Sequence, residues 1–156
     1  MFRLILILII YFTLNLQVYS IEQEVIIKKK VDNFIITNLD IKKEIKYITS
    51  LNPSLAEKIE KNNLITYAEN SLINEKIKYI ELSKFFDTDN VKNIPDIVIS
   101  NFYKRLGFDN LNQFKQYLNS KNLDYNIVLE KLYLEHLWNS LIYQKYNKKV
   151  NIDKEK

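Results

Sequence analysis

The chain has 156 residues, a formal net charge of +4 and no cysteine, so packing without disulfide bonds must hold its fold together. A single glycine and two prolines argue against many-stranded barrels, sandwiches and glycine-rich phosphate loops. The lysines alternate with glutamates at helical spacings, which is typical of solvated helix faces, and we expect no nucleic-acid partner.

The first residues have the pattern of a secretory signal peptide. Arg3 precedes an apolar run from Leu4 to Leu14, and Ser20 is a small residue at the expected cleavage position. Crossing a bilayer takes about 20 apolar residues, so this run predicts a signal peptide over 1–20 and no stable membrane span after cleavage. The alternative is an uncleaved anchor, whereas attachment of a lipid is excluded because it needs a cysteine.

Residues 24–37 are predicted to form a short β-hairpin. Two β-branched segments flank Asp32 and Asn33, which tolerate the left-handed backbone of a tight turn. A first helix follows, capped by Thr37 or by the residue after it, and it ends at Pro53.

Two further helices are expected before residue 87. Ser54 and Glu57 match a capping box, which predicts a short helix to about Lys61. Asn62 and Asn63 are the expected break, and a long amphipathic helix follows over 64–86.

The second half of the chain predicts three more helices. One begins at Pro95 and stops before Gly107, where a left-handed residue is favoured. A short one is capped by Asp109 or Asn110. The last, capped by Asp124, has an apolar stripe wider than one buried face needs, so it either lies centrally or leaves apolar surface uncovered. The fold class predicted is mainly α, a bundle of five or six helices with a short N-terminal β-hairpin.

Several local phrases in this order resemble the N-terminal domain of SurA-like periplasmic chaperones. They are Ile36–Ile41, Leu72–Ile77, Phe114–Leu118 and Leu123–Asn126, and the resemblance spans about residues 25–150. It implies a SurA-like N-terminal helical domain over 21–150, with a polar tail over 151–156. In that family parvulin-type prolyl isomerase domains follow, and none follows Lys156 here.

The resemblance implies an ATP-independent chaperone-like module that binds unfolded outer-membrane polypeptides in the periplasm, without a cofactor. Because the parvulin domain is absent, we expect no enzymatic activity. Two alternatives are a non-catalytic component of a prolyl isomerase system and a structural scaffold of the cell envelope. A homodimer that completes the client-binding groove is also left open.

The residues themselves give little support to catalysis or metal binding. The only histidine, His136, lies in the last predicted helix, where it cannot join a multi-histidine metal cluster and has only Asn139 or Ser140 as local partners at helical spacing. Asp87 and Asp89, like Glu22 and Glu24, lack the ligand density of a calcium loop. We therefore expect no catalytic residue and no metal site.

Four apolar residues are the candidate client contacts: Phe114, Tyr117, Trp138 and Leu141. A chaperone site consists of surplus aromatic and aliphatic surface instead of a fixed catalytic constellation. The competing interpretation for Trp138 is an ordinary core anchor, and the exposure of these side chains decides between the two.

Overall fold

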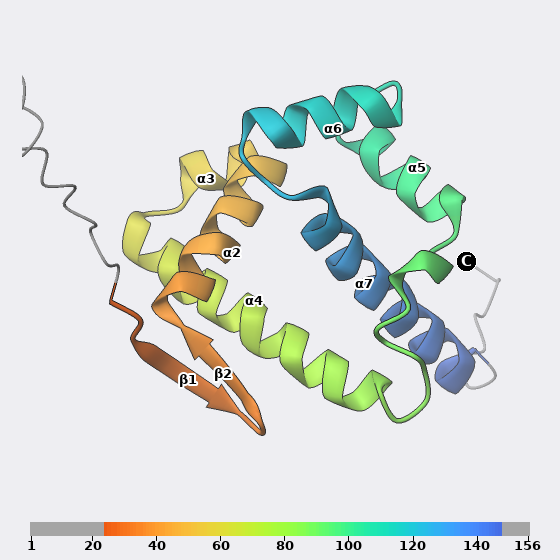
Figure 1. Cartoon of the computed structure of the whole chain (residues 1–156), viewed down its shortest axis with the longest axis horizontal. Coiled ribbons are helices and arrows are strands. Elements are labelled where there is room, and N and C mark those ends of the chain that lie inside the picture. The colour runs from red at the N-terminus through yellow and green to blue at the C-terminus, as the bar shows by residue number, and fades with distance from the viewer. Residues whose placement is uncertain (1–23, 148–156) are drawn as a thin grey trace, which may run out of the picture.

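The computed structural model describes residues 24–147, so the predicted signal peptide and the polar tail lie outside the described residues. Within this range the chain forms six α-helices and one two-stranded antiparallel hairpin, as Figure 1 shows, which confirms the predicted fold class. The elements are β1 (Ile27–Val31), β2 (Phe34–Thr37), α2 (Asn38–Leu51), α3 (Pro53–Lys58), α4 (Lys61–Leu82), the 3₁₀ turn η1 (Val91–Asn93), α5 (Asp96–Arg105), α6 (Leu111–Ser120) and α7 (Tyr125–Tyr146).

The hairpin forms where the sequence predicts it. Val31 pairs with Phe34 across the turn, in which Asp32 adopts a positive φ of 52°. Thr37 ends the hairpin and also caps α2, since its hydroxyl accepts the Asp40 N–H while the Asp40 carboxylate accepts the Thr37 N–H. One residue thus ends the strand and caps the helix.

The predicted boundary between the second and third helices is wrong. Asn52 caps α3 instead of Ser54, because its side-chain oxygen accepts the Leu55 N–H and Pro53 occupies the first helical position. The chain then turns at Ile59 and Glu60, and both asparagines that were the expected break lie in the first turn of α4. Asparagine is disfavoured inside a helix but is well tolerated near its N-terminus.

The later capping predictions are confirmed. Gly107 follows α5 with a φ of 88°, Asn110 accepts the Gln113 N–H at the start of α6, and Asp124 accepts the Asn126 N–H at the start of α7. The predicted α4 is too long at its C-terminal end, because a turn replaces the helix after Leu82.

Three separate apolar clusters hold the elements together. The first joins β2, α2 and α4, the second joins the end of α4, the entry to α5 and the middle of α7, and the third joins α5, α6 and the start of α7. Their fully buried side chains include Ile36 and Ala68 in the first cluster, Leu82 in the second, and Phe114 and Leu118 in the third. Each cluster is small, so no single core runs through residues 24–147.

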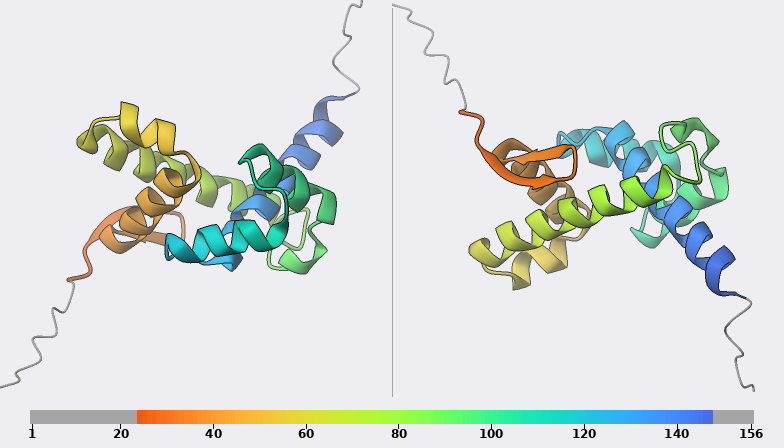
Figure 2. Two further views of the ribbon diagram at one scale, coloured as in Figure 1. Left: turned by 90° about the horizontal axis from the view of Figure 1, so that it is seen from above. Right: turned by 90° about the horizontal axis from the view of Figure 1, so that it is seen from below.

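Helices α4 and α7 form the middle of the molecule, with the hairpin and α2 at one end of this pair and α5 at the other, and α6 runs between α5 and α2 (Figure 1). The last turns of α7 project beyond the other elements in both views of Figure 2. No helix within residues 24–147 is long and apolar enough to cross a membrane.

Candidate functional site

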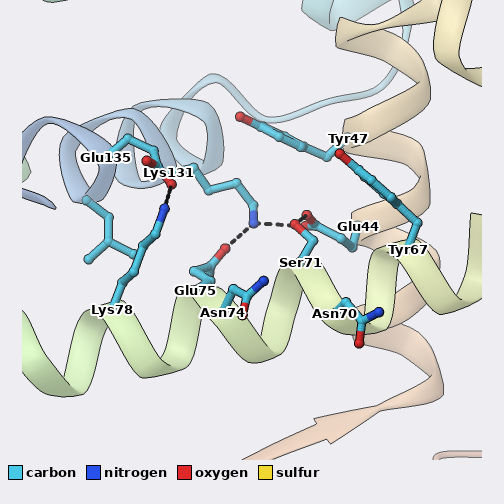
Figure 3. Close-up of a pocket in the computed structure, with 11 residues that line it drawn as sticks. Glu44, Tyr47, Tyr67, Asn70, Ser71, Asn74, Glu75, Lys78, Lys131 and Glu135 are labelled. Carbon is cyan, nitrogen blue, oxygen red and sulfur yellow. Dashed lines mark hydrogen bonds and ion pairs between the residues drawn. The ribbon is translucent and has the colours of Figure 1, made fainter. Parts of the chain in front are cut away.

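Charged side chains meet where α2, α4 and α7 come together. Lys131 of α7 places its Nζ 2.8 Å from Oε2 of Glu44 on α2 and also pairs with Glu75 on α4, as Figure 3 shows. The Ser71 hydroxyl donates a hydrogen bond of 2.7 Å to Glu44, and the Lys131 amine lies 5.0 Å from the ring centroid of Tyr47. We call Glu44, Glu75 and Lys131 the central ion cluster.

The charges of the central ion cluster depend on one another. The side chain of Glu44 is only 2% exposed and that of Lys131 16%. Burial by itself raises the pKa of Glu75 and lowers that of Lys131, since it penalises the charged forms. Their mutual attraction outweighs burial, so the pKa of Glu75 lies below its ordinary value and the pKa of Lys131 lies above it. Both groups are therefore charged near neutral pH.

A polar cavity of about 310 Å³ borders this cluster and is drawn in Figure 3. Lys78 of α4 and Glu135 of α7 form a second ion pair in its wall. Each lysine of the lining is thus already paired with a carboxylate. The other polar side chains of the wall are Tyr47, Tyr67, Asn70, Ser71 and Asn74.

A larger cavity of about 570 Å³ lies on the hairpin side of the same cluster. Its walls include strand β2, Leu72 of α4 and Ile127 at the start of α7. The three members of the central ion cluster border both cavities, so the cluster separates the polar cavity from this more apolar one.

The structure divides the four predicted client contacts between two clusters. Phe114 and Tyr117 belong to the third apolar cluster, and Trp138 and Leu141 belong to the second. Phe114 is 1% exposed and contacts surrounding aromatic rings, so it is a core residue that a client cannot reach. Tyr117 is half-buried and donates a hydrogen bond of 2.5 Å to the Ser50 carbonyl, which ties α6 to α2.

Trp138 and Leu141 remain partly exposed, and they lie at the start of an uncovered part of α7. Trp138, Ile142 and Tyr146 follow one another at four-residue intervals and therefore share one side of the helix. Ile142 is 38% exposed and Tyr146 is 42% exposed. We call these three residues the α7 stripe. Sequence reasoning proposed Trp138 as a client contact but not the other two, although their spacing was visible.

Sequence reasoning also missed the central ion cluster. A signal was available for two of the three members, which interrupt an apolar stripe at helical spacing: Glu44 lies between Ile41 and Ile48, and Lys131 lies between Val128 and Leu134. A charged residue on a buried helix face needs a partner of opposite charge. The pattern predicts that partners exist, but it does not say which helix supplies them.

The acidic loop before η1 has a structural part in the fold. Asp89 accepts a hydrogen bond from the Tyr79 hydroxyl, and the Asp87 carbonyl accepts one from the Tyr133 hydroxyl. Among residues 24–147 no group of three or more histidine, aspartate or glutamate side chains is arranged to hold a metal ion. His136 is half-buried on α7, and its carbonyl accepts a hydrogen bond from Ser140.

Comparison with known proteins adds no family to this description. No family model, no curated protein and no solved structure matches the chain.

Proposed function

We propose that this protein is a periplasmic, ATP-independent chaperone-like module that binds extended segments of unfolded outer-membrane proteins. The predicted export signal and the SurA-like phrases of the sequence motivate the compartment and the client class. The observation that carries the proposal is the α7 stripe, a row of aromatic and aliphatic side chains on the projecting end of a helix.

The stripe suits weak and broad binding. Each large apolar side chain contributes about 1.5–3 kcal/mol when it is fully buried. Three partly exposed residues supply only part of this, and association and ordering of the client cost several kcal/mol. Micromolar affinity, which corresponds to about −8 kcal/mol, is therefore the upper range for this surface alone. Such affinity allows a client to be released without an energy source.

The test is suppression of aggregation of an unfolded outer-membrane protein, followed by light scattering after dilution from urea. We expect the purified protein to slow aggregation when it is present in excess. The double variant Ile142→Ser with Tyr146→Ser should lose most of this effect, because it removes the exposed part of the α7 stripe. Far-UV circular dichroism and the urea midpoint of the variant should stay close to those of the unchanged protein, since neither residue is buried.

Ile97→Ser is the matched control. Ile97 is a large apolar residue that is exposed on α5 and lies outside the α7 stripe. If Ile97→Ser reduces the protective effect as much as the double variant does, the stripe is not the binding surface. If the unchanged protein does not slow aggregation and instead co-purifies with one stoichiometric partner, the proposal fails in favour of a scaffold.

A further inference from the structure

The larger cavity runs along one edge of the hairpin. Phe34, Ile35 and Ile36 all border it, although successive side chains of a strand point to opposite faces. A cavity that touches three consecutive strand residues therefore follows the edge of the strand instead of lying over one face. We call this space the β2 edge cavity.

The backbone of Ile35 faces this edge. In an antiparallel pair, hydrogen-bonded and non-hydrogen-bonded residue pairs alternate, and a two-residue turn is closed by a hydrogen-bonded pair. Val31 and Phe34 close the turn, so Lys30 and Ile35 form a non-hydrogen-bonded pair. The N–H and C=O groups of Ile35 thus point away from β1, in position to bond with an added strand.

The two edges of the hairpin differ in chemistry. Strand β1 carries three consecutive lysines, Lys28 to Lys30, and charged side chains on an edge strand discourage pairing with other chains. Strand β2 begins with Phe34, Ile35 and Ile36 and carries no charge. The edge of β2, whose open backbone groups face the cavity, is therefore the edge without protective lysines.

The opposite wall can receive side chains of an added strand. Leu123 and Ile127, from the α6–α7 connection and the first turn of α7, face the cavity together with Leu72 of α4. Side chains of an extended segment alternate, so every second residue of the segment would contact this wall. An alternating apolar and polar segment, as in a strand of a membrane barrel, meets this requirement.

Two exposed lysines at the rim of the β2 edge cavity could pair with an acidic residue of a ligand. The acidic side chains of the cavity are already engaged: Asp40 with Thr37, Asp124 with the Asn126 N–H, and both glutamates with Lys131. Lys43 and Lys46 of α2 are exposed at the rim and form no ion pair within residues 24–147. The lining is balanced overall, with four carboxylates and four lysines, and Lys43 and Lys46 are the two of these lysines without a carboxylate at ion-pair distance in the described part of the chain.

We propose that the edge of β2 accepts an extended polypeptide segment as an additional strand. The segment has apolar residues at alternate positions and an acidic residue that meets Lys43 or Lys46. Backbone hydrogen bonds supply affinity for any extended chain, and the wall and the two lysines select the side chains. This inference rests on the proposed binding of polypeptides, but it uses a surface separate from the α7 stripe.

The test uses a fluorescent peptide of alternating valine and threonine with one terminal glutamate, and binding to the purified protein is followed by anisotropy. Two N-methylated versions of the peptide carry methyl groups on alternate amide nitrogens, one on the odd set and one on the even set. An added strand turns one set toward β2 and the other toward solvent. We expect one version to bind at least about tenfold more weakly and the other to bind nearly as well as the parent. Equal effects of the two versions would overturn strand addition.

A charge reversal tests the rim. The double variant Lys43→Glu with Lys46→Glu should bind the glutamate peptide about tenfold more weakly and should prefer the same peptide with lysine in place of glutamate. Lys42→Glu is the control, since Lys42 is exposed on the same helix but does not border the cavity. If Lys42→Glu has the same effect as the double variant, the rim does not select the charge.

Two further outcomes separate this inference from the proposed function. If the protein slows aggregation but binds the two N-methylated peptides equally, the chaperone function stands and strand addition is removed. If binding depends on which set of amides is methylated but the unchanged protein does not slow aggregation, strand addition stands and the chaperone function is removed. The protein could instead form a dimer in solution that blocks peptide binding and that the peptide does not dissociate. That result would assign the edge of β2 to a second copy of the chain.

Discussion

Lys131 compensates two carboxylates at once, and each of the three charges comes from a different helix. Glu44 is the most buried of them, and within residues 24–147 its polar side-chain partners are Lys131 and the Ser71 hydroxyl. A buried ion pair adds little stability compared with apolar residues of the same size, but removal of one partner leaves an uncompensated charge. The cluster is thus more sensitive to single substitutions than to its complete replacement.

Lys131→Met is expected to destabilise the protein by about 3–5 kcal/mol, because it leaves the buried carboxylate of Glu44 without a cation and leaves Glu75 with Lys76 alone. Urea unfolding followed by circular dichroism measures this. Lys78→Met is the matched control: it removes the pair with Glu135, whose side chain is exposed, and should cost less than about 1 kcal/mol. The triple variant with Met at 44, 75 and 131 should recover most of the loss. Equal costs for the two single variants would contradict the buried role of Lys131.

At the scale of elements, Thr37 sets where the hairpin ends and where α2 begins. Thr37→Ala removes the side-chain half of the capping box and should lower the free energy of unfolding by about 1 kcal/mol. Thr66→Ala is the control, since Thr66 lies within α4 and its hydroxyl only bonds to the Asn62 carbonyl. That substitution should change stability by less than about 0.5 kcal/mol. A loss as large in Thr66→Ala would show that loss of a threonine side chain at any helical position, and not of the cap, accounts for the effect, since alanine has the higher helix propensity.

Local chemistry explains which elements could be predicted from the sequence. The caps at Asn110 and Asp124 and the stop at Gly107 depend on residues within one turn of one another, so the pattern alone locates them. The break at Ile59 and Glu60 has no such signature. The burial of Phe114 depends on rings from α5 and α7, which the periodicity of α6 does not reveal.

The candidate site was less accessible to sequence reasoning because its parts lie far apart in the chain. Glu44, Glu75 and Lys131 come from three helices, and the β2 edge cavity combines the hairpin with the start of α7. The sequence predicts that each helix has a buried face. It does not specify which faces meet or what space remains between them.

At the scale of the whole molecule, three small apolar clusters surround a charged centre, and stability should therefore depend on pH at both extremes. The pKa of Glu75 is lowered in the folded state, so its contribution is complete above its ordinary value of 4.5 and is lost as the pH falls through the lower folded value. The pKa of Lys131 is raised, so its contribution is complete below its ordinary value of 10.5 and is lost as the pH rises through the higher folded value. Burial, followed by the charge of Glu44, raises the pKa of Tyr47, which adds to the alkaline loss.

The melting temperature should accordingly be highest between about pH 5 and pH 10 and should fall on both sides. In Glu75→Gln this maximum should be lower, because Lys131 loses one partner, and the acid fall should be shallower, because one group with a lowered pKa has been removed. It should not vanish, since hydrogen bonds from Thr37 outweigh burial and also lower the pKa of Asp40. Differential scanning calorimetry from pH 3 to pH 11 measures both effects. The same acid slope in Glu75→Gln and in the unchanged protein would mean that the central ion cluster does not link α2, α4 and α7 in solution.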